Sequence, residues 1–424
     1  MENVIDILED RGFIEAIAGE QLRAKAAAAP LKVYCGFDPT SDSLHLGNLV
    51  AIMGLAWFQR CGHTPVALIG GATAMIGDPS GKSSERQLLD GSTIAHNAVA
   101  IRKNLETILR WNSSSAPALF LNNADWLSGF SLIEFLRDVG KHFRLSTMLA
   151  KESVKARLAV EAGMSFTEFC YQILQGYDFL HLFESYGVAV QMGGSDQWGN
   201  ITAGIELIRK VSAHAAYGIT FPLLVRSDGQ KFGKSEKGAI WLSKEKLSPF
   251  EFYQYLVRIP DADIIVLMRL LTFMDMEEIR TYERAMQGAT YEPNSAQKRL
   301  AVEVTRLVHG EEGVATALRA TEGLAPGSAT ELDATMLEAL TQDIPTCSLP
   351  YSQVIGAGVL DLFVTSGLAS SKGEARRLIQ NGGAYLNNIK VEKESACVDI
   401  EQLIDGRFLL LAVGKKNKLL VSLQ

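Results

Sequence analysis

The chain has 424 residues, of which 47% are hydrophobic and 21% charged, and its formal net charge is −7. This composition suits a globular protein with two or three domains, and no apolar run reaches the length of a membrane span. The five cysteines are scattered without a Cys-x-x-Cys pair, which argues against a zinc knuckle or a disulfide framework. The first residues resemble neither a secretory signal nor a transit peptide, so we expect a cytoplasmic protein.

The first informative element is a short strand that runs into a helix. Residues 33–37 are mostly β-branched or aromatic and predict a buried strand. Apolar residues then recur at helical spacing from residue 44 to 55, with Asp42 or Ser43 as the expected N-cap. The N–H groups at a helix start bind phosphate, and His45 stands there as a hydrogen-bond donor. We therefore expect a phosphate site.

Further strands are predicted at residues 65–71, 118–123 and 188–194, and they alternate with longer helical stretches. This alternation predicts an α/β fold with a doubly wound parallel sheet in residues 1–245. Such a sheet binds ligands beyond the carboxyl ends of its strands.

The pattern changes after the sheet. Residues 246–320 have helical spacing and predict a helical domain. Residues 321–353 mix Gly, Ala, Ser, Thr and Pro, which indicates a linker with room for a short helix. Residues 354–424 predict a separate small α+β module.

One helix of this last module has a basic face. Ser370 or Ser371 is its expected N-cap. Its inward side chains are Ala375, Leu378 and Ile379, and its outward ones are Lys372, Arg376 and Arg377. Residues 355–424 carry a net charge of +2, which leaves −9 for the rest of the chain. A mildly basic module on an acidic body is compatible with an RNA partner.

A second motif, Lys231-Phe232-Gly233-Lys234-Ser235, would by itself indicate a solvated turn. In combination with His45-Leu46-Gly47-Asn48 it resembles the KMSKS and HIGH signatures of class I aminoacyl-tRNA synthetases. The whole chain resembles the bacterial-type tyrosyl-tRNA synthetases, whose Rossmann-type catalytic domain has the form predicted for residues 1–245. The segments that carry this likeness are residues 34–40, 43–47, 70–73, 76–82, 165–171, 175–179, 193–200 and 231–235.

Two departures from the signatures are visible. Asn48 replaces the last histidine of HIGH, but its amide can still donate a hydrogen bond. Phe232 and Gly233 occupy the second and third positions of KMSKS, while both lysines and the hydroxyl are kept. We expect an active site with altered details.

The resemblance implies a tyrosine–tRNA ligase. Such an enzyme activates L-tyrosine with ATP, accompanied by Mg²⁺, to tyrosyl-AMP and pyrophosphate, and then transfers the tyrosyl group to the 3′ end of tRNA(Tyr). The protein acts by positioning the reactants and stabilising charge on the phosphate oxygens. The catalytic residues implied are Thr40, His45, Lys82, Arg86, Lys231 and Lys234.

The same resemblance implies two sets of binding residues. Tyr34 and Asp178 would hydrogen-bond the phenol hydroxyl, and Tyr171 and Gln175, four apart, would share a helix face. The tyrosine set is Tyr34, Asp78, Tyr171, Gln175, Asp178 and Gln197. The ATP set is Cys35, Gly36, Asp38, Gly47, Asn48, Asp196 and Lys234. No dedicated metal site is expected.

The resemblance also implies two partners. The last module resembles the S-four-like RNA-binding domain, with Lys372, Arg376 and Arg377 toward RNA. The family acts as a homodimer, and the apolar region 135–148 with Phe166 is the candidate interface, although a buried helix would look the same.

Three alternatives differ in what they predict. A tryptophanyl-tRNA synthetase should lack the Tyr34 and Asp178 pair and the RNA-binding tail. A non-catalytic RNA-binding protein on a synthetase body should have lost His45 or a signature lysine, yet His45, Lys82, Lys231 and Lys234 are all present. A nicotinamide-dependent dehydrogenase should have Gly-x-Gly-x-x-Gly after the first strand, and this motif is absent there.

Overall fold

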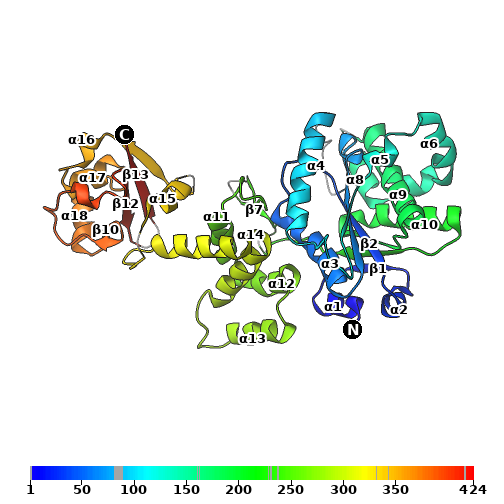
Figure 1. The fold of residues 1–424 in the computed structure, drawn as a ribbon, viewed down its shortest axis with the longest axis horizontal. Helices are drawn as coiled ribbons and strands as arrows, with labels where there is room; N and C mark the ends of the chain where they lie inside the picture. Colours follow the sequence, from blue (N-terminus) through cyan, green and yellow to red (C-terminus); the bar gives the residue numbers. More distant parts are fainter. Residues whose placement is uncertain are drawn as a thin grey trace. The chain divides into compact units, whose positions relative to one another are not determined.

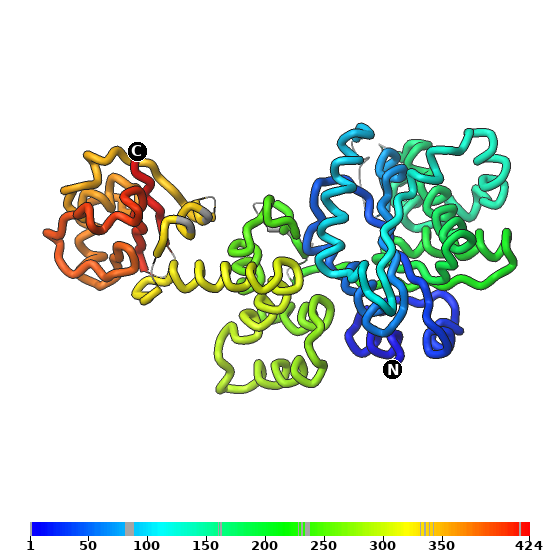
Figure 2. The backbone as a smooth tube through the Cα atoms, in the orientation of Figure 1, coloured from blue at the N-terminus to red at the C-terminus, as the bar shows by residue number. Residues whose placement is uncertain are grey.

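The computed structural model describes residues 2–80, 89–159, 161, 163–227, 229, 232–235, 238–330, 332–341, 343–414 and 417–424. The chain divides into two compact units (Figure 1). The first is Met1–Leu247 with Leu256–Val308, and the second is Ser248–Tyr255 with His309–Gln424. Along the tube in Figure 2, the first unit takes most of the blue-to-green chain and the second the yellow-to-red chain.

A six-stranded sheet forms the centre of the first unit. Its strands are β1 (Ala16–Ala18), β2 (Lys32–Phe37), β3 (Thr64–Ile69), β4 (Leu119–Asn122), β5 (Val190–Gly194) and β6 (Tyr217–Phe221). The order is β1-β6-β5-β2-β3-β4, with β1 antiparallel to β6 and all other pairs parallel. The predicted doubly wound parallel sheet is confirmed.

Helices cover the sheet on two sides, with α3 and α4 on one and α9 and α10 on the other (Figure 1). The helices before residue 247 are α1 (Val4–Asp10), α2 (Leu22–Ala28), α3 (Leu49–Arg60), α4 (Gly91–Glu106), α5 (Ala124–Leu127), α6 (Leu132–Asp138), α7 (Leu145–Leu149), α8 (Glu152–Leu158), α9 (Phe166–Tyr186) and α10 (Trp198–Ser212). Short 3-10 turns are η1 (Leu46–Asn48), η2 (Thr73–Met75), η3 (Gly140–His142) and η4 (Ser195–Gln197), and a two-stranded ribbon pairs β7 (Lys234–Ser235) with β8 (Gly238–Ala239).

The helix after β2 begins later than predicted. Asp42 and Ser43 are not its N-caps: η1 begins after His45, whose ring accepts from the Gly47 N–H, and α3 follows. Asp42 instead pairs with Lys246, and the Ser43 hydroxyl accepts from the Ser243 N–H. These long-range contacts hold residues 42 and 43 outside the helix, and local sequence could not reveal them.

Helix α9 is set by its ends. The Ser165 hydroxyl accepts from the Glu168 N–H at 3.2 Å, and Gly187 ends the helix with φ of +70°. The buried Glu168 also forms a two-pronged ion pair with Arg157 of α8, both contacts being 2.9 Å. These contacts fix the position of helix α9, which carries Tyr171, Gln175 and Asp178.

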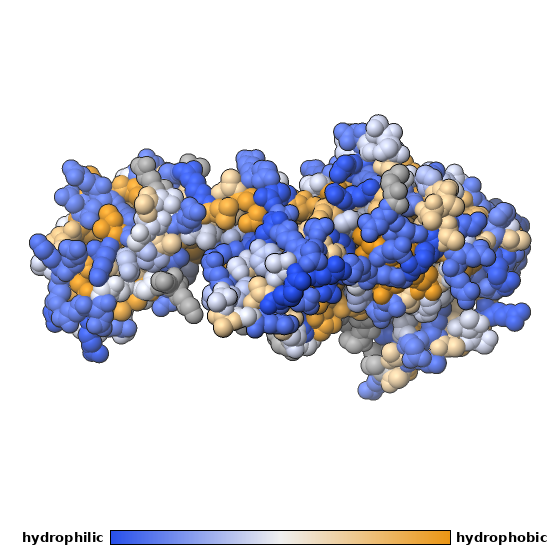
Figure 3. Space-filling model, turned by 90° about the horizontal axis from the view of Figure 1, so that it is seen from below, coloured by the Kyte–Doolittle hydropathy of each residue, from blue (hydrophilic) through white to orange (hydrophobic). Residues whose placement is uncertain are grey.

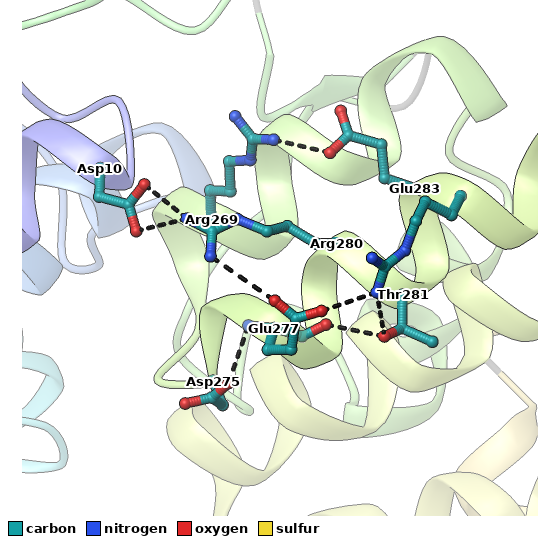
Figure 4. A network of polar contacts seen from close by, with 8 residues as sticks. Asp10, Arg269, Asp275, Glu277, Arg280, Thr281 and Glu283 are labelled. Atoms are coloured by element: carbon teal, nitrogen blue, oxygen red, sulfur yellow. Dashed lines mark hydrogen bonds and ion pairs between the residues drawn. The ribbon is translucent and has the colours of Figure 1, made fainter.

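Two further helices, α12 (Asp261–Leu271) and α13 (Met276–Met286), pack in the first unit. The buried Arg11 guanidinium donates to the carbonyls of Arg269, Thr272 and Met274, where α12 ends. It also lies 4.2 Å from the Trp57 ring of α3. Nearby, Arg280 of α13 binds Asp10 and Arg269 binds Glu283 (Figure 4). The helical pair is therefore attached to α1 and α3.

The second unit contains a five-stranded sheet with the order β11-β10-β12-β13-β9, in which β9 pairs parallel to β13. Its strands are β9 (Thr346–Leu349), β10 (Ala384–Leu386), β11 (Ile389–Lys390), β12 (Phe408–Val413) and β13 (Asn417–Leu423). Its helices are α15 (Ala334–Leu340), α16 (Tyr351–Val354), α17 (Val359–Thr365) and α18 (Lys372–Gln380), with a 3-10 turn η5 (Ile400–Gln402). Helices α11 (Pro249–Val257) and α14 (Ser295–Gly323), the latter kinked at Gly310, each have residues in both units.

Residues predicted as a linker contribute to this second unit. Strand β9 extends the sheet, and Leu337 of α15 packs with Phe408 and Leu420. In α18, Ser371 is the N-cap and Ala375 and Ile379 are buried, as predicted. Lys372 and Arg376 lie outward and pair with Asp361 and Glu394.

The surface mixes polar and apolar residues. Figure 3 shows hydrophilic residues over most of the face seen there, with hydrophobic residues gathered between them. Within the described part of the chain, no helix is long and apolar enough to cross a membrane.

Candidate active site at the switch point of the sheet

The strand order reverses between β2 and β5. From β2 the chain proceeds to β3 and β4 on one side, and from β5 to β6 on the other. Open α/β sheets bind ligands beyond the carboxyl ends of the strands at such a point. Both the His45 segment, after β2, and the Asp196 turn, after β5, begin there.

Backbone hydrogen bonds join the His45 segment to residues 240–242, which follow the KMSKS-like loop. The Leu46 N–H donates to the Ile240 carbonyl at 2.7 Å, and the Leu242 N–H donates to the Leu44 carbonyl at 2.8 Å. His45 and Trp241 form a bridge between these bonds, with ring centroids 6.4 Å apart. Residues about 190 positions apart are thus brought into one structure.

Glycines allow the two segments to approach closely. Gly233 has φ of +83°, and a Cβ atom there would lie 2.8 Å from the Gly47 nitrogen. A Cβ on Gly47 would in turn lie 3.0 Å from the His45 ring. Steric contact with Gly47 and the positive φ therefore explain why glycine occupies the third position of the KMSKS-like loop.

His45 is oriented by its neighbours. Its Nδ1 accepts from the Gly47 N–H at 3.1 Å, so the neutral ring carries its proton on Nε2 and can donate from that atom. The Asn48 amide oxygen accepts from the His45 N–H at 3.0 Å. Asn48 therefore holds the backbone of His45, and its NH₂ group keeps its donor capacity.

The predicted phenol pair lies in the core of the sheet domain. Tyr34 on β2 is 1% exposed, packs on Phe179 with centroids 5.3 Å apart, and its hydroxyl has no hydrogen-bond partner among the described residues. Asp178 accepts from the Asn123 amide at 2.9 Å and the Trp126 indole at 2.8 Å. Burial raises the pKa of the Asp178 carboxyl to about 7, although both hydrogen bonds lower it.

A chain of hydrogen bonds connects Asp178 with Tyr171. The Asn123 amide donates to Asp178 and to the Thr73 hydroxyl at 3.0 Å, and Thr73 donates to Asp38 at 2.8 Å. Asp38 also accepts from the Tyr171 hydroxyl at 2.8 Å. Asp38, predicted with the ATP set, thus bonds a residue of the tyrosine set.

Sequence reasoning missed Asn123 and Trp126 as members of this site. Asn123 ends the predicted strand at 118–123, so a polar residue at the carboxyl end of a strand was the available signal. Trp126 gave no signal, because an aromatic residue in a short helix usually packs in the core.

A second polar cluster surrounds Asp78. Its carboxylate accepts from Gln197 at 2.7 Å and from the Ser80 N–H at 2.9 Å. Gln197 in turn accepts from Gln175 at 3.2 Å, and the Asn200 amide donates to Gln175 at 2.9 Å. The remaining members of the predicted tyrosine set, from the segment after η2, from α9 and from η4, therefore lie together.

Three members of the predicted ATP set, Cys35, Gly36 and Asp38, lie at the end of β2, and the others lie in η1, η4 and β7. A Cβ on Gly36 would meet nothing within 4 Å, so space is open above this strand residue. Burial raises the pKa of the neighbouring Cys35 thiol to about 12, which keeps it protonated. Thr40 is exposed, and its N–H donates to the Asp38 carbonyl in a tight turn.

Several predicted cations cannot be placed. Lys82, Arg86 and Lys231 lie outside the described residues, and Lys234 is placed in β7 by its backbone without a described side chain. In the described ranges no cluster of three or more His, Cys, Asp or Glu could hold a metal ion.

Comparison with known proteins agrees with this geometry. Residues 25–324 match the family model described as "tRNA synthetases class I (W and Y)", and residues 336–421 match "Tyrosine--tRNA ligase SYY-like C-terminal domain". A tyrosine–tRNA ligase of Protochlamydia amoebophila is 64% identical over 100% of this chain and 99% of its own length. A chloroplastic/mitochondrial one of Arabidopsis thaliana is 54% identical over 99% of this chain and 84% of its own.

A solved structure has the same fold. It is a C-terminally truncated mitochondrial tyrosyl-tRNA synthetase of Aspergillus nidulans, with a TM-score of 0.67 and 31% identity, covering 75% of this chain and 92% of that one. The sheet with paired signature segments is thus the catalytic domain of a class I synthetase.

Within that class, the chain belongs to the tyrosyl-tRNA synthetase family, whose members are ATP-dependent tyrosine–tRNA ligases. The predicted family is confirmed, and the tryptophanyl, dehydrogenase and non-catalytic alternatives are set aside.

Proposed function

We propose that this chain activates L-tyrosine with ATP at the switch point and then transfers the tyrosyl group to the 3′ end of tRNA(Tyr). The observation that carries the proposal is the buried Tyr34 hydroxyl, which has no hydrogen-bond partner in the part of the chain that the structure describes, beside an Asp178 carboxyl already held by Asn123 and Trp126. A buried polar group costs free energy unless it is hydrogen-bonded, and a phenol hydroxyl would supply the missing bond.

The amino acid is held at both ends. Its phenol hydroxyl donates to Asp178 and accepts from Tyr34. Its ammonium group lies among Asp78, Tyr171, Gln175 and Gln197. Asp78, Gln175 and Gln197 already form one hydrogen-bonded cluster with Asn200, and Tyr171 donates to Asp38. Phenylalanine would leave the Tyr34 hydroxyl unpaired and is disfavoured.

Activation is an in-line displacement at the α-phosphorus of ATP. A carboxylate oxygen of tyrosine forms the new P–O bond, and the bond to the bridging oxygen of the β-phosphate breaks, so pyrophosphate leaves with the electron pair. Thr40, His45, Lys82, Arg86, Lys231 and Lys234 stabilise the negative charge on the phosphates. Cys35, Gly36, Asp38, Gly47, Asn48 and Asp196 line the ATP site. Mg²⁺ accompanies ATP as the counter-ion of its phosphates.

Transfer follows when a terminal ribose hydroxyl of the tRNA attacks the tyrosyl carbonyl and AMP leaves. In the second unit, Lys372, Arg376 and Arg377 on α18 contact the RNA through its phosphates. In the first unit, a cavity of about 210 Å³ is lined by the cationic side chains of Arg144, Lys151 and Lys210, together with Glu206 and several apolar residues. The Lys151 amine is buried without a partner in the described chain, which favours an anionic ligand.

A homodimer is part of the proposal. Six exposed apolar side chains lie in α6, α7 and the start of α9. They are Leu132, Ile133, Leu136, Leu145, Leu149 and Phe166, and four of them are at least 66% exposed. Several large apolar side chains exposed on neighbouring elements usually mark an interface. A second copy of the chain is the proposed occupant.

We propose that the protein acts in the cytoplasm, where it would meet free tRNA. Its similarity to the bacterial tyrosine–tRNA ligase of Protochlamydia amoebophila supports this location. Fractionation of cells that produce the protein, followed by a charging assay of each fraction, tests this location.

The deciding experiment is amino-acid-dependent exchange of labelled pyrophosphate into ATP, with tyrosine, phenylalanine and tryptophan compared side by side. Exchange with tyrosine alone is expected. Exchange with tryptophan would refute the substrate, and a folded sample that exchanges with none of the three would refute the activation chemistry.

A further inference from the structure

Helix α4 buries two asparagines toward the segment that carries His45. Asn97 is 6% exposed and Asn104 is 9% exposed, in line with the buried Ile94 and Ile101. Seven residues are close to two helical turns, so both amides lie on the same face of the helix. Buried amides are rare unless they satisfy specific partners.

Their partners are the two ends of the segment between β2 and η1. The Asn97 amide donates to the Pro39 carbonyl at 3.1 Å. The Asn104 amide oxygen accepts from the Leu44 N–H at 2.9 Å and lies 3.2 Å from the Ser43 hydroxyl. Residues 39–44 form no helix or strand, so side chains rather than a regular ladder satisfy this backbone.

Ser43 extends this contact to the segment that follows the second signature. Its hydroxyl accepts from the Ser243 N–H at 3.1 Å, eight residues beyond Ser235 of the KMSKS-like loop. Ser43 is 4% exposed, so water does not compete for these bonds. One buried cluster therefore fixes α4, the His45 segment and the strand-like segment 240–243 to one another.

We infer that Asn104 is a positioning residue for tyrosine activation: through Leu44 and Ser43 it holds the His45 segment and residues 240–243 in the register in which His45 meets the phosphates. This inference rests on the proposed role of His45 with ATP. Asn104 does not touch a reactant, and it acts by holding the donor in place before the charge develops.

The test is Asn104→Leu, which keeps the size of the side chain and removes the acceptor. The kcat of tyrosine-dependent pyrophosphate exchange is expected to fall about tenfold or more, as for the loss of one buried hydrogen bond from the transition state. The KM for tyrosine should stay within about twofold, because the bonds of Asn104 go to Ser43 and Leu44 and to no member of the tyrosine set. Asn104→Asp, which keeps the acceptor, should retain kcat within about threefold.

Ile101→Val on the same buried face is the matched control. It removes one methylene from the core, so it should lower Tm while kcat stays unchanged. If Asn104→Leu lowers only Tm, as Ile101→Val does, then Asn104 is structural and the inference is wrong.

Ser43→Ala gives an independent variant if the leucine variant does not fold. It should lower kcat with little change in KM for tyrosine, and an unchanged kcat would overturn the inference. Wild-type protein run in parallel separates the two proposals, since its failure to exchange with tyrosine refutes the proposed function instead.

Discussion

At the scale of single residues, the site depends on polar groups that are buried before any ligand arrives. The Tyr34 hydroxyl lies in the core without a partner among the described residues. Burial raises the pKa of this hydroxyl, and the nearby Asp178 carboxylate raises it further. Such groups lower the stability of the protein alone and favour binding of a molecule that satisfies them.

The Tyr34→Phe change separates these two effects. Without the hydroxyl, the free energy of unfolding of the ligand-free protein should stay equal or rise, because an unsatisfied buried group is removed. The KM for tyrosine should rise about tenfold, as expected for one lost hydrogen bond. Urea denaturation and pyrophosphate exchange measure the two quantities, and an unchanged KM would contradict the proposed contact.

Asp178 gives the site a pH dependence. Burial raises the pKa of its carboxyl from 3.8 to about 7, so the folded protein binds this proton more tightly than the unfolded chain does. Its contribution to stability is therefore full below pH 3.8 and is lost as the pH rises through 7. The charged carboxylate accepts the hydrogen bond that the phenol hydroxyl donates. The KM for tyrosine should therefore fall as the pH rises through 7.

Trp126→Phe tests which groups set this pKa. The indole donates to the carboxylate and lowers its pKa, so its removal should move the fall in KM to higher pH. A series of KM values on both sides of pH 7 measures the shift. Identical profiles for the two proteins would show that Trp126 does not hold the charge.

At the scale of elements, the helical pair α12 and α13 is attached to α1 and α3 by two kinds of contact. Arg11 is 3% exposed and satisfies three carbonyls at the end of α12. The Arg280 side chain is 45% exposed and binds Asp10 at 2.8 Å (Figure 4). If the Arg11 contact is lost, buried carbonyls are left without a donor. If the Arg280 contact is lost, water can hydrogen-bond the exposed Asp10 carboxylate instead.

The two arginines should therefore differ in their effect on stability. Arg11→Met is expected to lower the free energy of unfolding by about 3 kcal/mol, because buried carbonyls lose their donor. Arg280→Ala should change it by less than about 1 kcal/mol, as is usual for exposed ion pairs. Chemical denaturation of both variants provides the measurement, and equal losses would show that burial does not govern this contact.

At the scale of the whole molecule, two surfaces are proposed to bind partners: the exposed apolar group of α6, α7 and α9, and the basic face of α18. They lie in different units, so their roles can be tested independently of each other and of the switch-point site.

The apolar group is tested by Phe166→Asp, since this side chain is 76% exposed. A charge there should oppose burial against a second copy and shift the protein toward monomer in sedimentation velocity. Val99→Asp on α4, where the side chain is 61% exposed, is the control and should leave the oligomeric state unchanged. If both variants behave as the wild type, the interface lies elsewhere.

The basic face is tested by replacing Lys372, Arg376 and Arg377 together with alanine. The affinity for tRNA should fall and depend less steeply on salt, by about 0.7 to 0.9 log units per lost phosphate contact. Pyrophosphate exchange should not change. Arg407→Ala, an exposed arginine of the same unit outside α18, is the control. An unchanged salt slope for the triple variant would remove α18 from the RNA surface.

The sequence by itself determined the class of fold and the family. The apolar runs at 33–37, 65–71, 118–123 and 188–194 became β2 to β5, because strands buried on both faces need continuous apolar residues. The signature segments were recognisable because their chemistry requires particular residue types in a fixed order. The cap and faces of α18 followed from local spacing, with Ser371 as its N-cap.

Only the tertiary structure decided which distant groups meet. The helical segment after β2 starts beyond Asp42 and Ser43, because Lys246 and Ser243, about 200 residues away in sequence, bind these two residues. The tertiary structure added Asn123 and Trp126 to Asp178, and Asn104 to the His45 segment. A hydrogen bond between remote residues depends on how strands and helices pack. The spacing of apolar residues along the chain predicts the elements but not which of them pack together.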